Sequence, residues 1–402
     1  MQVVKVVKQR YSPSEETLNL LEDFRLMMND CIRIGIRENI TSMKALSLKC
    51  YNALSQYDVA SCYRLTAISK AAGILCNYRK LLRKNPNTNA KIPYVRKMQL
   101  VDCYGFRIQG KRLRLTLRAY EYVYVDLNPH TLAVISDFSV RSVTLTTCTI
   151  VLSFSKETTT VVMEPTGVLG IDRNLDNITI STTNGQDITY DLSKATETKS
   201  KYRAVKSHFT RNDVRIRRHI YRKYGEKQRN KTGNILHNVS NQIVEKAKAE
   251  KLGIAMENIK GIRKLYRKGN GQGNHYRGRM NSWTYYELQR QVEYKARWEG
   301  IPVVYVDAWG TSSKCSTCGC KTYPNEHRQL YCPQCDIPLD RDVNAARNVR
   351  DKGRLRFSLV EPPSEAMVQE RGTPLILKVD GGKLHHAQQQ MQQNQSISNV
   401  SM

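Results

Sequence analysis

VLGIDRNLDNITIS, residues 168–181, is the stretch that decides the fold of the second half of this chain. It is an apolar run interrupted by Asp172, and the turn residues TTNGQ follow at 182–186 before the next apolar stretch begins. Short apolar runs bounded by turn residues predict buried strands. A carboxylate in a buried strand raises the free energy of the folded state unless a partner compensates its charge. Asp172 therefore needs a partner from elsewhere in the chain.

Two further acids stand at comparable positions. Glu257 ends the apolar run LGIAME, and Asp342 lies beside Asp340 at the start of the helical run DRDVNAARNVR. A single buried acid is more often one half of a structural salt bridge, whereas three such acids indicate a shared cation. Carboxylate oxygens suit Mg²⁺ or Mn²⁺, and two such ions about 3.5–4 Å apart can hold the attacking and leaving oxygens of a phosphodiester. The sequence thus predicts a catalytic site, with Mg²⁺ or Mn²⁺ as cofactor, at Asp172, Glu257 and Asp342.

The order of the three acids indicates a nuclease class. An acid on a first strand, a second on a later strand and a third on a late helix is the arrangement of ribonuclease H-like nucleases. Transposases of that fold typically place Glu last, whereas resolvase-type (RuvC) nucleases place it second. Here Glu257 is the second of the three. We therefore expect an RNase H-like (RuvC) α/β nuclease domain.

The cysteines form a second constellation. Five of the eleven lie within residues 315–335, and four of these make two Cys-x-x-Cys pairs separated by thirteen residues. Four thiolates at this spacing fit one tetrahedral Zn²⁺, and a site with four protein ligands is structural because it leaves no open position. Cys320 is a fifth candidate, but the paired spacing favours the other four. An odd cysteine count does not fit a disulfide framework, and a redox pair or buried free thiols are the remaining alternatives.

The charge balance indicates a polyanionic partner. The chain has 64 Lys and Arg against 36 Asp and Glu, a formal net charge of +28, so nucleic acid is the expected partner. A membrane-surface protein would need a long amphipathic basic helix or a lipid anchor, and the sequence contains neither. The N-terminal residues lack a signal-peptide pattern, and no window approaches the roughly 18 apolar residues of a membrane span. We therefore expect no membrane partner.

A basic helical region follows the first nuclease strands. Between residues 201 and 229 only Asp213 and Glu226 interrupt a dense series of Lys and Arg. A solvated helix face is the plain alternative, but so few acids cannot neutralise the series by ion pairing. We expect phosphate contacts from Arg211, Arg215, Arg218, Arg222 and Lys223.

The N-terminal half predicts a different architecture. Residues 2–10 look like a strand, and Ser12 is the expected cap of a helix that starts a helical block of roughly 70 residues. From about residue 90 the apolar period changes to two, with a hairpin signature in FRIQGKRLRLTL around Gly110. We expect a β-barrel with the helical block as an insertion.

With these residues in view, the chain resembles TnpB, the nuclease of a class of bacterial and archaeal insertion sequences, which is related to the compact type V CRISPR effectors. The resemblance covers residues 168–350 and lies in stretches that occur in the family's order. The N-terminal half resembles the family only in layout. The stretches are GIDRNLDNITIS, ILHNVSNQIVEKAK, LGIAMENIKGI, NSWTYYELQRQVEYKARWEGIPVVYVDAWGTSSKCSTCG, YCPQC and DRDVNAARN.

The resemblance implies an RNA-guided DNA endonuclease. A guide RNA made from the transposon end would pair with one strand of a double-stranded DNA target, beside a short target-adjacent motif, and the RuvC site would cut both strands. The protein would act as a monomer in the cytoplasm of a prokaryote, with the nucleoid when bound to DNA. The residues carried over are the catalytic, Mg²⁺-binding acids Asp172, Glu257 and Asp342 and the zinc ligands Cys315, Cys318, Cys332 and Cys335.

Asp342 is chosen over Asp340 because the second acid of DRD matches the family's catalytic position, which leaves Asp340 to support the turn. Since the zinc module of the family lies near the nucleic-acid path, Lys314 and Arg328 are also expected to contact phosphate.

The implied fold is α+β and multidomain. An N-terminal β-barrel (wedge-like) domain carries a helical recognition insertion, and a RuvC-like nuclease domain carries an inserted zinc ribbon. Composition predicts a disordered tail. The boundaries are 1–11 and 90–165 for the barrel, 12–89 for the insertion, 166–310 and 339–352 for the nuclease domain, 311–338 for the ribbon and 353–402 for the tail.

Three local departures from the family pattern concern geometry. Arg173-Asn174 replaces the common Leu-Gly and resembles an archaeal variant, Ala308 and Trp309 stand where a Pro is usual, and Asp336 replaces the Gly after the last zinc cysteine.

Other functions remain open at this point. One is an RNA-guided DNA-binding regulator without efficient cleavage, which would lack catalytic acids. Another is a transposition accessory protein, which would show a nucleophilic Tyr with paired His or a Glu-last triad. A zinc protein that merely coats nucleic acid would leave the buried acids unexplained. The presence of all three acids favours the nuclease.

Overall fold

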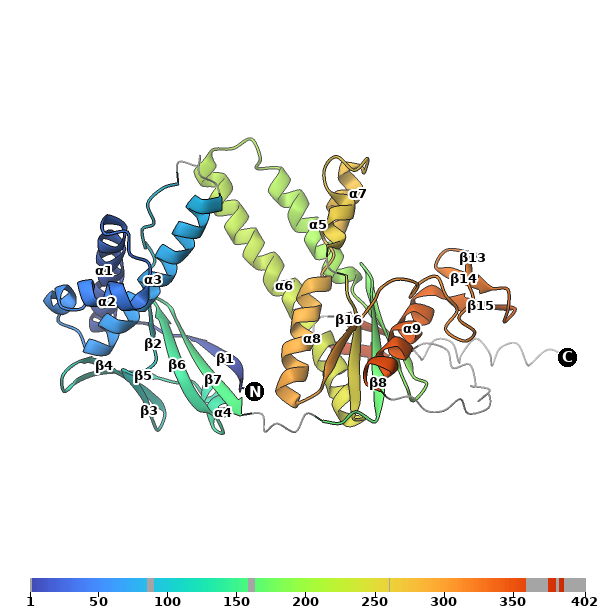
Figure 1. The fold of residues 1–402 in the computed structure, drawn as a ribbon, viewed down its shortest axis with the longest axis horizontal. Helices are drawn as coiled ribbons and strands as arrows, with labels where there is room; N and C mark the ends of the chain where they lie inside the picture. Colours follow the sequence, from blue (N-terminus) through green and yellow to red (C-terminus); the bar gives the residue numbers. More distant parts are fainter. Residues whose placement is uncertain are drawn as a thin grey trace. The chain divides into compact units, whose positions relative to one another are not determined.

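The computed structural model describes residues 2–84, 90–157, 163–259, 261–358, 375–380 and 383–386. The chain divides into two compact units, an N-terminal unit, Met1–Thr158, and a C-terminal unit, Thr159–Met402 (Figure 1). None of the helices in the described ranges combines the length and the apolar character that crossing a membrane requires.

Helices α1 and α3 form the centre of the helical block in the N-terminal unit. Ser14 caps α1, where its hydroxyl accepts a hydrogen bond from the Thr17 amide at 3.3 Å. The expected cap at Ser12 is therefore wrong by two residues, because the Ser14 oxygen is the one that reaches a free amide of the first turn. The helices of this unit are α1 (Glu15–Arg37), α2 (Met43–Cys50), the short 3₁₀ helix η1 (Ala53–Gln56), α3 (Ser61–Lys84) and α4 (Pro129–Ile135).

The strands of the N-terminal unit form two separate open sheets, so the expected β-barrel is wrong for the described residues. One sheet has the order β1-β7-β6-β2 and the other β3-β4-β5. No strand of one sheet pairs with a strand of the other in the described ranges, and α4 separates β5 from β6 along the chain. The strands are β1 (Gln2–Arg10), β2 (Gln99–Asp102), β3 (Phe106–Gln109), β4 (Arg112–Arg118), β5 (Glu121–Asp126), β6 (Ser139–Thr146) and β7 (Thr149–Glu157).

A seven-stranded mixed sheet with the order β12-β11-β8-β9-β10-β16-β17 is the centre of the C-terminal unit. Strands β8, β9 and β10 form an antiparallel meander, and β11 and β12 lie parallel on the other side of β8. The strands are β8 (Gly167–Arg173), β9 (Asn177–Thr182), β10 (Asp187–Asp191), β11 (Leu252–Glu257), β12 (Val303–Val306), β16 (Leu375–Asp380) and β17 (Lys383–His386).

Helices provide the parallel crossovers of this sheet. An antiparallel pair, α5 and α6, leads from β10 to β11, and α8 leads from β11 to β12, as parallel neighbours require. A small three-stranded sheet of β13, β14 and β15 then precedes α9. These elements are α5 (Ser193–Ser207), α6 (Val214–Ala249), the 3₁₀ helix η2 (Ile262–Tyr266), α7 (Asn274–Met280), α8 (Tyr285–Glu299), β13 (Tyr323–Pro324), β14 (Gln329–Cys332), β15 (Ile337–Asp340) and α9 (Arg341–Arg356).

The predicted disordered tail, 353–402, falls largely outside the described residues. Within it, α9 continues to Arg356, and β16 lies parallel to β10 at the edge of the sheet with β17 antiparallel beside it.

Helices cover both faces of the large sheet (Figure 1). On one face, buried side chains of α6 and α8 pack on alternate residues of β8 and β11, such as Ile171 and Met256. On the other face, Val349 of α9 packs on Val168 and Ala255. Because successive strand residues point to opposite faces, Asp172 and Glu257 lie on the face that α9 covers.

The packing of α9 on β8 depends on a glycine. A Cβ atom on Gly170 would collide with the backbone nitrogen of Arg350 and the backbone oxygen of Ala346 in α9. Gly353 of α9 lies over Ala255 of the neighbouring strand β11, and there too a side chain would have little room. The backbone of α9 therefore lies directly on the strands that carry two of the predicted catalytic acids.

We expect Gly170→Ala to lower the free energy of unfolding by about 2 kcal/mol or more, because rigid backbone atoms, which cannot rotate away, occupy the space for the new methyl group. Gly73→Ala is the matched control: Gly73 is an exposed residue within α3 with open space around it, so the same substitution should be neutral or stabilising there. Urea unfolding measures both, and equal effects of the two substitutions would contradict the close approach of α9 to β8.

Candidate functional site

The three predicted acids lie near the C-terminal ends of strands β8 and β11 in the large sheet. Asp172 is near the end of β8, Glu257 is the last residue of β11, and Asp342 is in the first turn of α9. Their exposed fractions are 6%, 8% and 6%. Strands β8 and β11 are parallel and Met256 pairs with Ile171, so the next residues along the two strands are the two acids. The fold thus brings all three carboxylates into one electrostatic environment.

The pKa of Asp172 records this proximity. Burial is the largest cause that raises it, the charges of Glu257 and Asp342 raise it further, and the pKa reaches about 8. A hydrogen bond from Asn174, whose Nδ2 lies 2.7 Å from Oδ2 of Asp172, opposes the rise. Three buried carboxylates therefore repel one another, and a divalent cation would compensate them with the oxygen ligands that Mg²⁺ and Mn²⁺ prefer.

Other side chains hold the acids in place. Thr311 donates a hydrogen bond to Oε1 of Glu257 at 2.6 Å. Asn177 donates to Oδ2 of Asp342 at 3.0 Å, and Arg328 donates to the same oxygen from Nε at 3.1 Å and from a second guanidinium nitrogen. Arg328, which we expect to contact phosphate, forms an ion pair with an acid of the site in this structure.

The carboxylates are not drawn together as tightly as the cysteines. Among the described residues, the four predicted zinc ligands are the only group of three or more His, Cys, Asp or Glu whose ligating atoms all lie within 4.8 Å of one another. The acids are therefore arranged as neighbours with separate hydrogen-bond partners.

The departure Arg173-Asn174 has a structural role. The buried Arg173 guanidinium donates to the side chain of Gln289 in α8 at 2.9 Å and to the backbone oxygen of Glu257. Asn174 bonds both Asp172 and, at 3.0 Å, Asn177. These two residues connect the end of β8 with β11, α8 and β9. Sequence reasoning noted the departure but missed its function, and the only signal was two polar residues at the end of a buried strand.

Asp340 and Asp342 have different positions. Asp340 is the N-cap of α9, and its Oδ1 accepts hydrogen bonds from the amides of Asp342 and Val343 at 2.8 and 2.9 Å. An N-cap carboxylate satisfies amides that have no partner within the helix. Asp340 thus supports the turn, as the sequence predicts, while the charge of Asp342 acts on Asp172 and raises its pKa.

The four paired cysteines form a metal-binding cluster. The Sγ atoms of Cys315 and Cys335 lie 3.9 Å apart and those of Cys318 and Cys332 lie 3.4 Å apart. Zn–S bonds near 2.3 Å in a tetrahedron place the sulfurs about 3.8 Å from one another. The cluster therefore fits one metal ion such as zinc, and Cys320, which is exposed, lies outside it.

The turns after the two cysteine pairs need a left-handed backbone. Gly319 follows the first pair with a φ of +75°, and Asp336 follows the second pair with a φ of +50°. Gly adopts this region without steric cost, and Asp is among the few other residues that do so readily. The replacement of the usual Gly by Asp336 therefore keeps the turn, and the Tyr331 hydroxyl donates a 2.5 Å hydrogen bond to its carboxylate.

The cysteine cluster is attached to α9 by two asparagines. Asn344 accepts a hydrogen bond from the Ser316 amide and donates to the backbone oxygen of Lys314, both at 2.8 Å. Asn348 donates to the backbone oxygens of Thr311 and Lys314, also at 2.8 Å. The metal cluster is therefore coupled to the helix that carries Asp342.

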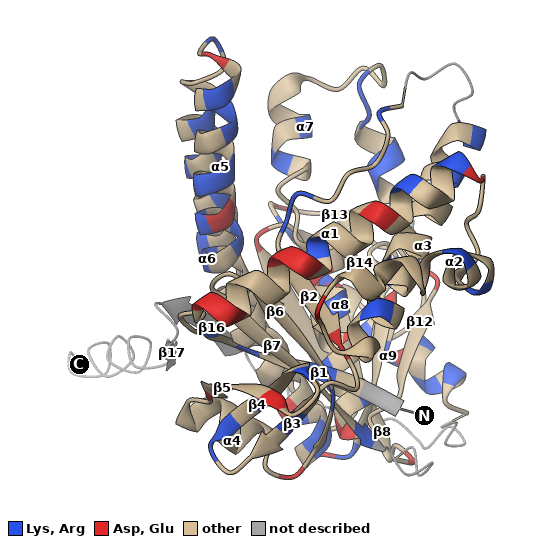
Figure 2. Ribbon diagram, turned by 90° about the vertical axis from the view of Figure 1, so that its left-hand side faces the viewer, with Lys and Arg blue, Asp and Glu red and all other residues tan. Residues whose placement is uncertain are grey.

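The predicted phosphate contacts lie on exposed surfaces. Arg211 is in the turn between α5 and α6, while Arg215, Arg218, Arg222 and Lys223 are exposed on α6. None of these five side chains forms an ion pair within the described part of the chain. Figure 2 shows Lys and Arg along the length of α5 and α6 with few acids among them.

Lys314 is exposed beside the first cysteine pair, and its ammonium lies 4.8 Å from the centre of the Trp309 ring. This cation–π contact leaves the ammonium at the surface.

We expect the purified protein to contain one zinc ion per chain. Cys332→Ser should lose the zinc and lower the melting temperature by several degrees, because a structural zinc contributes directly to folding. Cys320→Ser is the control, since it removes a neighbouring thiol outside the cluster. Elemental analysis and thermal unfolding measure both effects, and zinc loss from the Cys320 variant would contradict the assignment of the four ligands.

We expect the free energy of unfolding of the zinc-loaded, Mg²⁺-free protein to fall between about pH 5 and pH 8. The folded pKa of Asp172 lies above its value in the unfolded chain, so the folded state keeps this proton while the unfolded state loses it. Asp172→Asn removes the titration and should be more stable than the wild type above about pH 8. Added Mg²⁺ should raise the melting temperature of the wild type but not of this variant.

Asp176→Asn is the matched control, because Asp176 is a partly exposed acid that pairs with Arg279. Parallel stability curves for the wild type and Asp172→Asn over this pH range would contradict the prediction, because they would show that the pKa of Asp172 is the same in the folded and unfolded states.

The sequence of this chain matches known proteins. The family model described as the Cas12f1-like TNB domain matches residues 285–349, from α8 to the first half of α9. A TnpB-like protein of Methanocaldococcus jannaschii is 28% identical over 288 residues, which are 65% of this chain and 98% of that protein. The CRISPR-associated endodeoxyribonuclease Cas12f1 of Sulfoacidibacillus thermotolerans is 36% identical over 116 residues, which are 28% of this chain and 25% of that protein. The chain thus spans nearly all of the first relative and a quarter of the second.

A solved structure agrees with these matches in its fold. A cryo-EM structure of a Cas12f1–sgRNA–target DNA complex superposes with a TM-score of 0.57 and 15% identity, over 83% of this chain and 81% of that chain. The α+β fold is therefore similar to that of Cas12f1. The chain is thus a homologue of a TnpB-like protein, and it contains a segment that matches the Cas12f1-like TNB domain; both matches support the TnpB family, which is related to the compact type V CRISPR effectors.

Proposed function

We propose that this protein is an RNA-guided DNA endonuclease of transposon origin. It binds a guide RNA from the transposon end and cleaves the phosphodiesters of matched double-stranded DNA beside a short target-adjacent motif. The observation that carries the proposal is the meeting of three buried acids from β8, β11 and α9, whose charges act on one another at Asp172. Three meander strands followed by two parallel strands support the RuvC-like assignment, and the names of the relatives support the guided mechanism.

The catalytic cofactor is Mg²⁺ or Mn²⁺ and the structural metal is Zn²⁺. A pair of divalent ions, when bound, stabilises the charge on the attacking and leaving oxygens of the phosphodiester. Asp172, Glu257 and Asp342 hold the ions, while Asn174, Thr311 and Asn177 orient the carboxylate oxygens through the hydrogen bonds described above. Hydrogen bonds of this kind fix ligand orientation in metal sites.

Exchange of partners at Asp342 is part of this proposal. Its Oδ2 accepts hydrogen bonds from Arg328 and Asn177, so one of these two side chains would have to release this oxygen for it to hold a metal ion. Arg328 is partly exposed and has room to move towards a phosphate group of the substrate.

The basic α5–α6 pair supplies the nucleic-acid surface. An RNA–DNA heteroduplex is recognised through its backbone in a positively charged channel, while base pairing reads the sequence. Arg211, Arg215, Arg218, Arg222 and Lys223 are unpaired cations on such a surface, and each contact with a phosphate releases counterions.

A second candidate is an RNA-guided DNA-binding regulator, or a transposition accessory protein, without efficient cleavage. A protein of this kind would need no metal ion at Asp342 and would keep the ion pair between Arg328 and Asp342. The cleavage experiment distinguishes the two candidates.

We expect the protein expressed with the DNA that flanks its gene to carry one discrete RNA, and the complex to cut matched duplex DNA only with Mg²⁺ or Mn²⁺. Asp342→Asn should lower the cleavage rate by about 100-fold or more while RNA and DNA binding persist, because a metal ligand is lost. Asp340→Asn is the control: Asn is an equally good N-cap, so cleavage should remain close to the wild-type rate.

Bound RNA with guided DNA binding but no cleavage would support the regulator. The absence of any discrete RNA would contradict the guided mechanism. Equal losses from the two substitutions would contradict the assignment of Asp342 over Asp340.

A further inference from the structure

The three-stranded sheet β3-β4-β5 of the N-terminal unit has one apolar face and one face of arginines and tyrosines. Ile108 pairs with Leu113, and Leu113 pairs with Val125, on the apolar face. One residue along each strand, Arg107 pairs with Arg114, and Arg114 pairs with Tyr124, on the opposite face. The alternation of strand residues therefore places the two sets on opposite faces of the sheet.

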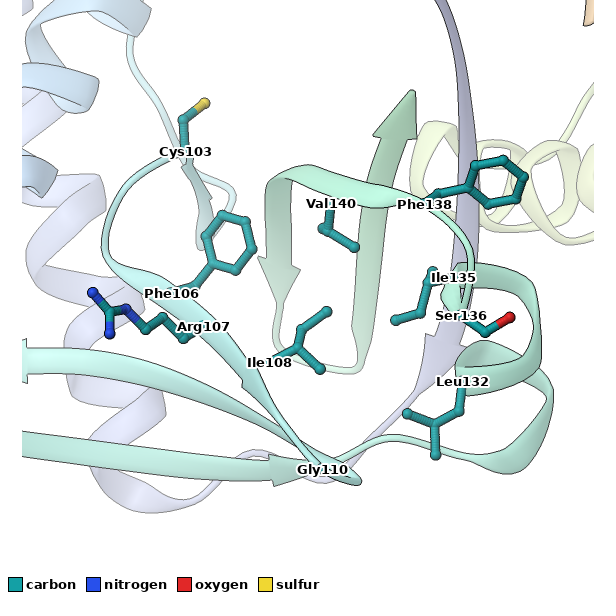
Figure 3. Close-up of a pocket in the computed structure, with 10 residues that line it drawn as sticks. All are labelled: Cys103, Phe106, Arg107, Ile108, Gly110, Leu132, Ile135, Ser136, Phe138 and Val140. Carbon is teal, nitrogen blue, oxygen red and sulfur yellow. The ribbon is translucent and has the colours of Figure 1, made fainter. Parts of the chain in front are cut away.

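Figure 3 shows what lies behind this sheet. Phe106 and Ile108 point from β3 into a hollow of about 710 Å³ that Ile135 and Val140 also line; Arg107 borders the same hollow, but its guanidinium extends to the other side of the strand.

Two arginines stand directly opposite each other without a compensating acid. Like charges at paired positions of an antiparallel sheet destabilise it. Neither Arg107 nor Arg114 forms an ion pair with any residue in the described ranges, and Nε of Arg114 is buried without a hydrogen-bond partner. By contrast, Arg112 on the same face pairs with Asp126 at 2.8 Å. The unpaired arginines point to an anionic ligand.

Tyrosines surround these arginines and are largely exposed. Tyr104, Tyr120 and Tyr124 expose 83%, 93% and 50% of their surface. The guanidinium carbon of Arg114 lies 4.3 Å from the centre of the Tyr122 ring, which leaves the cation fixed on an aromatic surface. Exposed aromatic rings beside arginines are the surface on which proteins stack unpaired bases.

Tyr120 is held in a costly conformation. Its φ is +62° in the turn between β4 and β5, a region where Gly or Asn has lower energy than an aromatic residue. The Tyr120 side chain buries almost none of its own surface, so it adds little to the stability of the fold. Strain of this kind is kept where the side chain has a function.

The two sets of residues share one hollow. A pocket of about 350 Å³ is lined by Arg107, Arg114, Tyr104, Tyr120 and Tyr122 among others. This volume falls within the range of small-ligand sites and is large enough for one nucleotide.

We propose that this surface, which we call the Tyr–Arg face (Tyr104, Arg107, Arg114, Tyr120, Tyr122 and Tyr124), binds unpaired nucleotides of a single-stranded nucleic acid. The bases stack on the exposed tyrosines and the phosphates bind Arg107 and Arg114. The inference deepens the proposed function and rests on it for the source of the strand, which is either an unpaired segment of the guide RNA or the displaced strand of the DNA target.

The test uses the full chain freed of bound nucleic acid and labelled oligonucleotides of about 12 nucleotides: a single-stranded RNA, a DNA of the same sequence and their duplex. Fluorescence anisotropy gives the affinity for each across a salt series. Tyr120→Gly should weaken single-strand binding by about fivefold or more, the loss of one stacked base, and leave duplex binding unchanged. Its thermal stability should equal or exceed that of the wild type, because glycine adopts the positive φ without strain.

The double variant Arg107→Gln, Arg114→Gln should lower the slope of log affinity against log salt by about 1.4 for the single strand, as expected for two lost phosphate contacts. Arg112→Gln is the matched control, since it removes the same charge from an arginine that is already paired, and its slope should not change. If the substitutions weaken binding of the single-stranded RNA more than that of the DNA, the face binds the guide RNA. The opposite order assigns the face to the displaced DNA strand.

Equal losses for single strand and duplex, or an equal fall in slope from Arg112→Gln, would overturn the proposal and indicate diffuse charge attraction. The outcome is separable from the nuclease proposal, because the Tyr–Arg variants keep all three acids and binding of these probes is measured apart from cleavage. Unchanged binding by the Tyr–Arg variants together with Asp342-dependent cleavage would reject this inference alone. Weaker single-strand binding by the Tyr–Arg variants, together with no Asp342-dependent cleavage, would reject the nuclease proposal alone.

Discussion

The contact of α9 with β8 at Gly170 is the constraint on which the rest of the candidate site depends. Asp342 belongs to the first turn of α9, and the other two acids belong to strands beneath that helix. A side chain at Gly170 or Gly353 would collide with the facing element and push the helix away from the strands. Packed cores transmit such displacements because they contain few voids, so the spacing of the acids is set by the absence of two side chains.

The cysteine cluster, which precedes α9 in the chain, also holds this helix in place. The chain leaves the large sheet at β12, forms the cysteine cluster and β13-β14-β15, and returns as α9. Asn344 and Asn348 bind the backbone around the first cysteine pair, and Arg328 from the turn before β14 reaches Asp342. This explains why a zinc-type cluster precedes two acids in the sequence: it fixes the entry of the helix whose cap is Asp340 and whose first turn carries Asp342.

The sequence predicted the parts of this arrangement that follow from local pattern. Asp172 and Glu257 stand out because a charge in a short apolar run has no other ready explanation, and the four cysteines stand out by spacing. The barrel was wrong because alternation predicts strands but does not tell which strands pair across α4. The supporting roles of Thr311, Asn174 and Arg328 depend on side chains that meet only after folding. Nor does the composition of residues 353–402 indicate β16 and β17, because a short edge strand needs only backbone pairing.

The central claim is that three carboxylates from separate elements form one divalent-metal site. The most direct measurement is an anomalous difference map at the manganese absorption edge, from crystals of the wild-type protein equilibrated with Mn²⁺. The account predicts manganese in direct contact with oxygens of Asp172, Glu257 and Asp342, with Arg328 displaced from Asp342 or sharing it. Manganese bound elsewhere, or no manganese at a concentration that supports cleavage, would contradict the account.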